Sequence, residues 1–327
     1  MTLLVRSAAA TAAGLALMAA FSAQEAPKRW YKGNLHTHTL NSDGDSLPKT
    51  VAEWYKGHGY QFLVLSDHNY LTPVEPLNQD LAVADKFLLV PGEEVTDRFG
   101  SQPVHVNGYG LGQLVEPTGG ESLIATVQGN VDAIRGARGL PSVNHPNFGW
   151  AMTSQDLAAI GNLRMLEVYN GHPMVHNRGG GGAESLEEMW DALLTGGKKI
   201  YGIAVDDAHT FKRIAKEESN PGKGWVVVRA PELSAASVLN ALENGEFYSS
   251  TGVELEDVRS ADGELRVAVK PAGNIKYTIS FIGAGGKVLA TSFERVAAYK
   301  LQDGEPYVRA VVRASNGDDA WTQPLWR

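Results

Sequence analysis

Short apolar runs alternate with helix-like segments from Trp30 to about residue 230. The runs lie at 61–66, 86–92, 104–110, 140–145, 163–170 and 199–209. Continuous rather than alternating apolarity is typical of parallel strands that are covered on both faces. Segments with apolar residues at helical spacing include 46–57, with Ser46 as a candidate cap, 121–136 and 184–197. Repeated strand–helix units predict an α/β fold with a parallel sheet, and this number of units favours a closed barrel.

After residue 250 the pattern changes to alternating polar and apolar positions. Alternation is visible at 264–271, 277–283, 287–292 and 307–315, with turn signals at Gly285-Gly286 and Asn316-Gly317. We therefore expect a barrel domain over 30–250 and a small antiparallel β domain over 251–327. The helical pattern at 234–247 is expected to close the first domain or to bridge the two.

Residues 1–23 have the order of a secretory signal. Arg6 is the only charged residue, an apolar run follows, and small residues stand at Ala20, Ser22 and Ala23. This segment is too short and too alanine-rich for a stable membrane insertion, although an uncleaved anchor remains the alternative. It predicts an exported protein, periplasmic or secreted.

Composition restricts the chemistry further. The chain has 327 residues, no cysteine and a formal net charge of −8. Disulfides and thiolate ligands are therefore excluded, so any metal must be held by histidines and carboxylates. The negative charge disfavours nucleic acid and anionic membranes as partners. No pattern in the sequence indicates an oligomeric state.

Histidines and acids recur where the predicted strands end. His36 and His38 end the first strand, and in an extended strand they point to the same side, as two ligands of one metal must. Later strand ends carry Asp67, His68, Glu93, Glu94, His105, His145, Asp207 and His209. Charged groups crowded at one end of a barrel need cations to neutralise them. The pattern predicts a multinuclear metal site.

Six motifs also carry a family resemblance. In order, they are "LHTHTLNSDG", "LSDHN", "PGEEVT", "VHVNGYG", "NHP" and "DDAH". Between residues 33 and 230 they resemble the motifs of the PHP (polymerase and histidinol phosphatase) family. The resemblance implies a distorted (β/α)7 barrel with two or three metals at the carboxyl ends of the strands.

The same resemblance implies a ligand for each position. One metal takes His36, His38, Glu94 and Asp207; Glu94 bridges to a second metal held by His105 and His145; a third uses Asp43, His68 and His209. Asp67 is expected to orient a ligand histidine, with Glu93 and Asp206 outside the ligand set. Imidazole and carboxylate together suit Zn, Mn or Fe.

The expected reaction is hydrolysis of a small-molecule ester by a metal-bridging hydroxide. Asp207 or His209 is expected to protonate the leaving group. Phosphoesters are the usual substrates of the family, and Arg178 is a candidate phosphate-binding cation, together with Lys212 and Arg213. His172 and His176, in the same segment as Arg178, are candidates for lining the pocket.

Two alternatives stay open. The segments "GKGWVVVRA", "ALENGEFYSSTG" and "DDAWTQPLWR" resemble an exported branch of PHP proteins that includes a carbaryl hydrolase. That resemblance implies a carbamate or carboxyl-ester hydrolase as the alternative to a phosphoesterase. A non-catalytic binding module built on a degenerate barrel is the second alternative, although all nine ligand positions carry competent residues.

Overall fold

The computed structural model describes residues 27–327, so the expected export signal at 1–23 lies outside the described residues. The strands are β1 Arg29–Asn34, β2 Phe62–Leu65, β3 Leu88–Phe99, β4 Gln102–Tyr109, β5 Leu140–Val143, β6 Met165–Asn170, β7 Tyr201–Val205, β8 Trp225–Ala230, β9 Phe247–Ser250, β10 Leu255–Ala261, β11 Glu264–Val269, β12 Tyr277–Gly283, β13 Lys287–Ser292, β14 Val296–Lys300, β15 Tyr307–Ala314, β16 Asp319–Thr322 and β17 Leu325–Trp326. The helices are α1 Pro48–Gly57, α2 Glu75–Leu81, α3 Leu123–Gly136, α4 Ser154–Ala158, α5 Leu186–Thr195 and α6 Ala235–Glu243, with short 3-10 turns η1 Phe148–Trp150 and η2 Ala284–Gly286. Within the described residues, no helix has the length and apolar character needed to cross a membrane.

Local sequence explains where the helices begin. Ser122 caps α3 by accepting a hydrogen bond from the Ala125 N–H at 3.1 Å. Ser185 and Glu188 form a reciprocal capping box at the start of α5. The prediction of Ser46 as a cap is wrong, because α1 begins at Pro48 and its flanking residue makes no side-chain cap bond. The fixed φ of proline is sufficient to start this helix.

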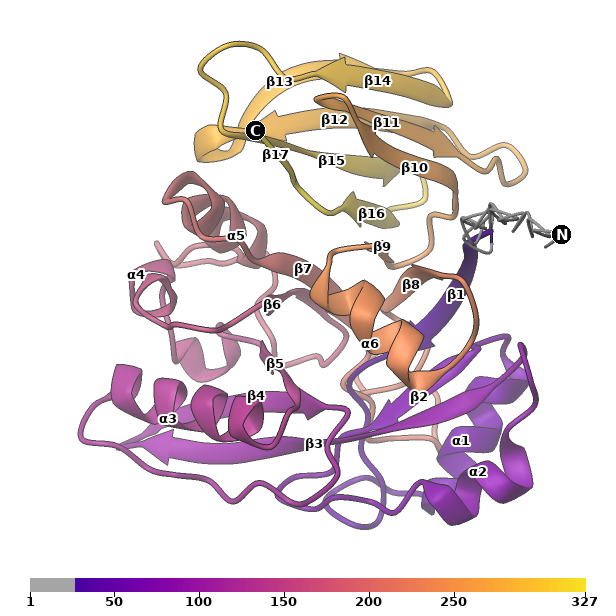
Figure 1. Cartoon of the computed structure of the whole chain (residues 1–327), viewed down its shortest axis with the longest axis vertical. Helices are drawn as coiled ribbons and strands as arrows, with labels where there is room; N and C mark the ends of the chain where they lie inside the picture. Colours follow the sequence, from indigo (N-terminus) through magenta and orange to yellow (C-terminus); the bar gives the residue numbers. More distant parts are fainter. Residues whose placement is uncertain (1–26) are drawn as a thin grey trace, which may run out of the picture.

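The main sheet is mixed rather than all-parallel (Figure 1). It has 14 strands, and its order is β13-β12-β15-β16-β9-β8-β1-β2-β3-β4-β5-β6-β7, with β17 paired to β15. Strands β1, β2 and β3 pair in parallel, as do β5, β6 and β7, but β4 is antiparallel to both of its neighbours. The reason is local: only residues 100 and 101 separate β3 from β4, and so short a connection permits only a hairpin.

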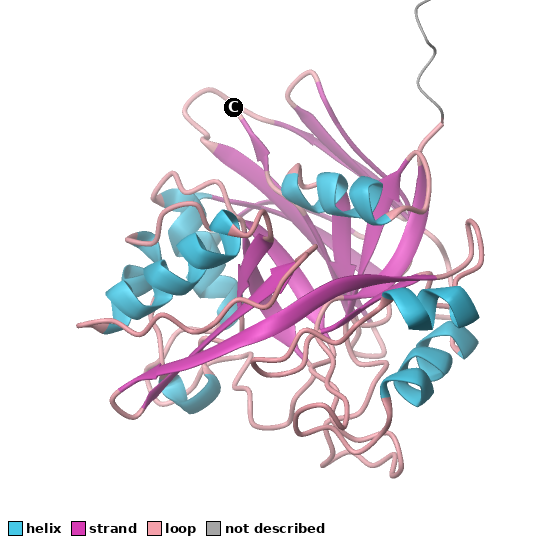
Figure 2. Cartoon of the chain, turned by 60° about the horizontal axis from the view of Figure 1, so that its bottom comes forward, coloured by secondary structure: helices cyan, strands magenta, loops and turns pink. Residues whose placement is uncertain are grey.

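The predicted closed barrel is also wrong. The ladder of hydrogen-bonded strands ends at β7 and does not return to β1, which instead pairs with β8. Beyond the ends of β1 and β7, a single parallel bridge joins Thr37 to Ala208. This bridge lies beyond the carboxyl ends of both strands, where the motif residues lie. Helices flank the sheet, and loops gather at one end of it (Figure 2).

The antiparallel character predicted for the C-terminal region is confirmed, since β12, β13, β15 and β16 pair antiparallel and β10, β11 and β14 form a separate antiparallel sheet. The strands β12, β13, β15 and β16 belong to the main sheet, which they join through the pairing of β16 with β9. A buried ion pair between Arg309 and Asp191 of α5, with N–O distances of 2.7 Å, connects the two regions further.

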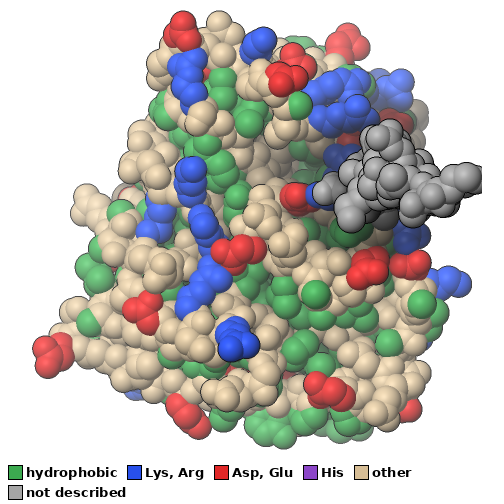
Figure 3. Space-filling model, viewed as in Figure 1, with side chains coloured by type: hydrophobic (Ala, Val, Ile, Leu, Met, Phe, Trp, Pro, Cys, Tyr) green, Lys and Arg blue, Asp and Glu red, His purple; other side chains and the backbone are tan. Residues whose placement is uncertain are grey.

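An apolar cluster supports the strands from inside. It contains Phe62, Val90 and Ile203 from the strands, together with Val238 and Leu242 from α6, all nearly inaccessible to solvent. This packing holds the strands in fixed register, so the residues at their carboxyl ends have defined positions. On the face drawn in Figure 3, acidic and basic side chains are interspersed with apolar ones, and neither charge dominates.

Candidate metal centre

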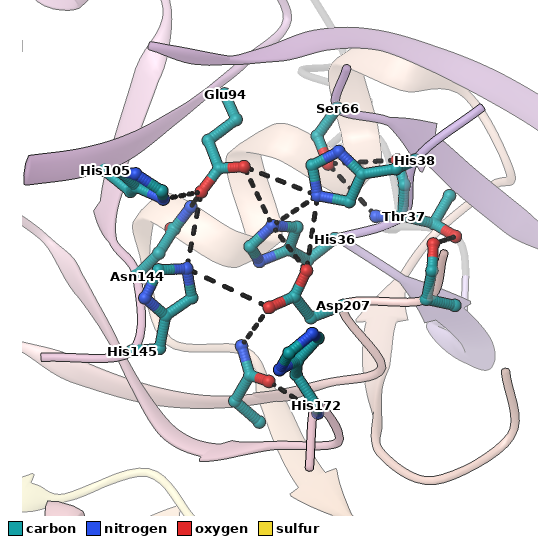
Figure 4. Close-up of polar contacts among 12 residues, drawn as sticks. His36, Thr37, His38, Ser66, Glu94, His105, Asn144, His145, His172 and Asp207 are labelled. Carbon is teal, nitrogen blue, oxygen red and sulfur yellow. Dashed lines mark hydrogen bonds and ion pairs between the residues drawn. The ribbon is translucent and has the colours of Figure 1, made fainter. Parts of the chain in front are cut away.

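The structure brings all nine predicted ligand residues together at the carboxyl ends of the strands. Four overlapping groups have candidate ligand atoms within 4.8 Å of one another: His36, His38 and Glu94; His36, His145 and Asp207; His68, Glu94 and His105; and His38, Asp43, His68 and His209. Figure 4 shows side chains from separate strands converging on Glu94 and Asp207. Their role as ligands stays a prediction.

The innermost group is formed by His36, His38, Glu94 and Asp207. The Nε2 atoms of the two histidines lie 3.1 Å apart, and each lies 3.4 Å from Glu94 Oε2 and 3.2 Å from Asp207 Oδ1. A tetrahedral metal with bonds of about 2.0–2.1 Å separates its ligand atoms by about 3.3 Å. The two imidazoles are therefore spaced from each other and from each carboxylate as ligands of one divalent metal.

Glu94 reaches a second group through its other oxygen. Glu94 Oε1 lies 3.0 Å from His105 Nδ1 and 3.4 Å from His145 Nε2. In the described part of the chain, buried Glu94 Oε2 and His105 Nδ1 make no hydrogen bond of good geometry, although His68 Nδ1 lies 2.9 Å from the first and Glu94 Oε1 lies 3.0 Å from the second. Because buried polar atoms are nearly always satisfied, these atoms fit a bound cation better than an empty pocket. A carboxylate with each oxygen in a different group has the arrangement of a bridging ligand.

The third group is the most solvent-exposed. Asp43 lies 3.3 Å from His209 Nε2 through Oδ1 and 3.4 Å from His68 Nε2 through Oδ2, and its side chain is 53% exposed. A tight loop brings Asp43 back to the end of β1. That loop requires Gly44, since a Cβ at this position would lie 2.6 Å from the His38 carbonyl oxygen.

Two cluster residues have strained backbones. His145 has φ of +24° and Asp207 has φ of +50°, in the left-handed region that non-glycine residues rarely adopt. Such conformations cost about 1–3 kcal/mol each and persist where the surroundings impose them. The strain places both side chains toward the same centre.

Opposite charges stabilise one another within the metal-free cluster. Burial opposes charge on His36, but the carboxylates of Asp207 and Glu94 outweigh it and raise the pKa of His36 well above its usual value. The imidazoles likewise lower the pKa values of Glu94 and Asp207 well below their usual range, against the effect of burial. Neighbouring carboxylates, against burial, raise the pKa of His68 to about 10, whereas burial and adjacent imidazoles lower the pKa of His38 to about 4. A divalent cation binding here displaces protons.

Sequence reasoning missed the residue that orients His36. Glu167, fully buried on β6, accepts a hydrogen bond from His36 Nδ1 at 2.7 Å, which leaves His36 Nε2 as the free lone pair. Glu167 also accepts from the His145 backbone N–H at 2.7 Å and from Asn170 Nδ2 at 2.8 Å. Asn144 was missed as well, and its Nδ2 donates to Glu94 Oε1 at 2.8 Å. An isolated glutamate inside the apolar run 163–170 was the available signal.

Asp67 reaches a predicted ligand histidine through Ser42, whose Oγ lies 2.8 Å from Asp67 Oδ1 and 3.4 Å from His38 Nδ1. No described histidine contacts its carboxylate, which instead accepts from the Thr39 backbone N–H at 2.7 Å, from Ser42 Oγ at 2.8 Å and from Thr72 Oγ1 at 2.6 Å. Asp67 therefore fixes the loop that carries Asp43. Buried carboxylates find donors wherever they are available, and this loop supplies them.

The two acids expected outside the ligand set have other contacts. Glu93 Oε1 accepts from the Val115 N–H at 2.8 Å, and burial raises the pKa of Glu93 to about 7. Asp206 accepts from Tyr55 Oη and from the backbone N–H groups of Lys223 and Gly224.

The structure places Arg178 and Arg213 beside acids outside the cluster, and it shows Lys212 only through its backbone N–H, which donates to Asp45 Oδ2 at 3.1 Å. The Arg178 side chain is 84% exposed and pairs at 3.9 Å with Asp319, which is not a cluster residue. Arg213 pairs with Glu217 and Glu218 in its own loop. Of the two candidate pocket histidines, His176 stacks on Trp150 with ring centroids 4.4 Å apart.

His172, in contrast, lies beside the cluster. Its ring centroid is 5.4 Å from that of His209, and Figure 4 draws it next to Asp207. Burial, together with the nearby imidazoles, lowers the pKa of His172.

No protein-family model and no curated protein sequence matches the chain. A two-domain protein from Bacteroides vulgatus containing a predicted PHP-like metal-dependent phosphoesterase is similar at 16% identity and a TM-score of 0.48, covering 86% of this chain and 90% of that chain. A candidate metal-dependent phosphoesterase from Bifidobacterium adolescentis is similar at 15% identity and a TM-score of 0.41, covering 57% of this chain and 89% of that one. An amidohydrolase from Chromobacterium violaceum, with bound sulfate and no metal, is similar at 16% identity and a TM-score of 0.36, covering 55% and 88%. The case for a metal centre rests on the residues of this chain.

Proposed function

We propose that this protein is a metal-dependent hydrolase of small-molecule esters, with phosphoesters as the first candidate substrates. The observation that supports this proposal best is Glu94, whose two oxygens face two separate groups of histidines. Two or three divalent ions (Zn, Mn or Fe) would be held by the nine residues, with the most exposed group around Asp43 as the third site.

When bound, such ions supply a hydroxide at neutral pH and stabilise negative charge on the substrate. The protein's own contribution is to hold the ligands in fixed tautomers. His36 Nδ1 donates to Glu167, and His209 Nδ1 donates to the Asp207 carbonyl oxygen at 2.9 Å. Each ring therefore presents the Nε2 lone pair to the cluster. Asp207 or His209 remains the proposed proton donor to the leaving group.

A second candidate is hydrolysis of a carbamate or carboxyl ester at the same centre. It is favoured by the positions of Arg178 and Arg213, which pair with acids away from the cluster. Phosphate sites usually contain arginine or lysine, whereas a neutral ester needs no such cation.

Metal analysis and a substrate panel test the proposal. Metals per chain are measured first, followed by assays with aryl phosphate monoesters and diesters beside aryl carbamates and aryl esters. His36→Ala, which removes one ligand of the innermost group, is the control. A protein that binds no metal and is inactive on every substrate would contradict the enzyme proposal and favour a binding module. Cleavage of esters without cleavage of phosphates would favour the second candidate.

A further inference from the structure

The loop that follows β6 is fixed against the cluster at its first residues. Asn170 Nδ2 donates to Glu167 Oε2 at 2.8 Å and to Asp207 Oδ2 at 3.0 Å, while Asn170 Oδ1 accepts from the His172 backbone N–H at 2.8 Å. Asn177 closes the loop, because its side chain bonds both the N–H and the carbonyl oxygen of Asn170 at 2.8 Å. His172 is therefore held at a defined position next to the metal ligands.

A backbone hydrogen bond fixes the tautomer of His172. The Met174 N–H donates to His172 Nδ1 at 3.2 Å, so this nitrogen carries a lone pair and the ring proton lies on Nε2. His172 Nε2 makes no hydrogen bond to the described residues, and it is not among the buried atoms that lack a partner. This N–H is therefore open to solvent and available to a ligand.

The ring proton of His172 lies on the opposite nitrogen from that of the predicted ligand histidines beside it. In His36 and His209 the Nδ1 atom faces an oxygen acceptor, so Nε2 is the lone pair that a metal needs. In His172 the Nδ1 atom faces a donor, so Nε2–H can donate a hydrogen bond but cannot ligate. Its ring centroid lies 5.4 Å from that of His209 and 6.2 Å from that of Phe148.

We propose that His172 donates its Nε2–H to an oxygen of the ester substrate, and to the negative charge that develops there, on the side of the cluster formed by Asp207 and His209. The proposal rests on the proposed hydrolase function. It assigns recognition of the substrate oxygen to a neutral imidazole in place of the arginine that this centre lacks among its described neighbours.

Two substitutions distinguish the effect of the N–H donor of His172 from the effect of its aromatic ring. His172→Phe keeps an aromatic ring without the N–H, and His172→Gln retains an amide donor. His176→Phe is the matched control, because His176 belongs to the same loop but stacks on Trp150. With bis(p-nitrophenyl) phosphate as probe, we expect a kcat about 100-fold lower for His172→Phe, with unchanged metal content. We expect His172→Gln to recover activity to within about tenfold of the original protein.

Two further measurements do not depend on turnover. Calorimetry with inorganic phosphate and the metal-loaded protein should give a Kd about tenfold higher for His172→Phe than for the control. Histidine 15N NMR of the metal-free protein should show His172 with an unprotonated Nδ1. Equal phosphate affinity in His172→Phe and the control, or a protonated Nδ1, would overturn the proposal. If the unsubstituted protein cleaves no ester, the hydrolase function fails, and the phosphate and NMR results still decide the role of His172.

Discussion

Glu167→Gln is expected to weaken metal binding without changing the size of the side chain. The carboxylate of Glu167 faces three donors, namely His36 Nδ1, the His145 N–H and Asn170 Nδ2, at 2.7, 2.7 and 2.8 Å. A glutamine has one acceptor oxygen and an NH2 group that only donates. Whichever way it is oriented, its NH2 group meets at least one buried donor, and the negative charge beside His36 is lost.

The expected losses of metal affinity and stability follow from the contacts of Glu167. Loss of a partner that orients a ligand histidine usually lowers metal affinity about 10- to 100-fold. That range corresponds to about 1.4–2.7 kcal/mol of binding free energy. A buried donor left unpaired lowers the free energy of unfolding by a further ~1–3 kcal/mol. We therefore expect weaker binding and a less stable protein.

Competition titration with a chelator of known affinity measures the binding term, and urea unfolding of the metal-free protein measures the stability term. Glu93→Gln is the matched control, since Glu93 is also fully buried but bonds the Val115 N–H instead of a ligand. Metal affinity should be unchanged in this control. Affinity in Glu167→Gln equal to that of the control would refute the orienting role of Glu167.

Three other predictions use the same structure. Asp67→Asn should loosen the loop that carries Asp43, so the chain should lose one equivalent of metal while the innermost site stays filled, as metal analysis by mass spectrometry would show. Metal at 100 times its Kd should stabilise the folded state by about 2.7 kcal/mol, and a melting temperature unaffected by EDTA would contradict this. The stability of the metal-free protein should fall at both high and low pH. Because the pKa values of His36 and His68 are raised, their contribution to stability is present below about pH 6.5 and is lost as the pH rises toward 10. Because the pKa values of Glu94 and Asp207 are lowered, their contribution is lost as the pH falls below about 4. Urea midpoints measured in EDTA should therefore be highest near pH 5–6, and a flat profile between pH 6.5 and 9 would exclude the ion pairs.

Most strands and helices could be predicted from the sequence, but the way in which the strands pair could not. Apolar runs located β2, β3, β5 and β6, because burial on both faces leaves a continuous signal. The hairpin between β3 and β4 was overlooked, since the turn at Gly100 and Ser101 is only two residues long and both strands read as ordinary buried runs. The bridge between Thr37 and Ala208, which joins the segments that follow β1 and β7, is a long-range contact that no local pattern encodes.

For the candidate site, strand-end motifs identified residues that do converge, because the carboxyl ends of the strands meet at one edge. The partners that orient them were harder to find. Glu167 and Asn144 act through hydrogen bonds to residues far away in sequence, so spacing gives little indication of them. The Arg178 prediction relied on loop proximity along the chain, and the loop directs that side chain toward Asp319 instead.

The pairing of β9 with β16 places β12, β13, β15 and β16 in the same sheet as the strands that carry the candidate metal ligands. A fragment that ends at residue 250 would leave β9 as an unpaired edge, with exposed N–H and C=O groups that promote aggregation. It would also leave Asp191 of α5 without Arg309. Residue 250 is therefore an unfavourable point at which to divide the chain, because the cut would break both the sheet and a buried ion pair.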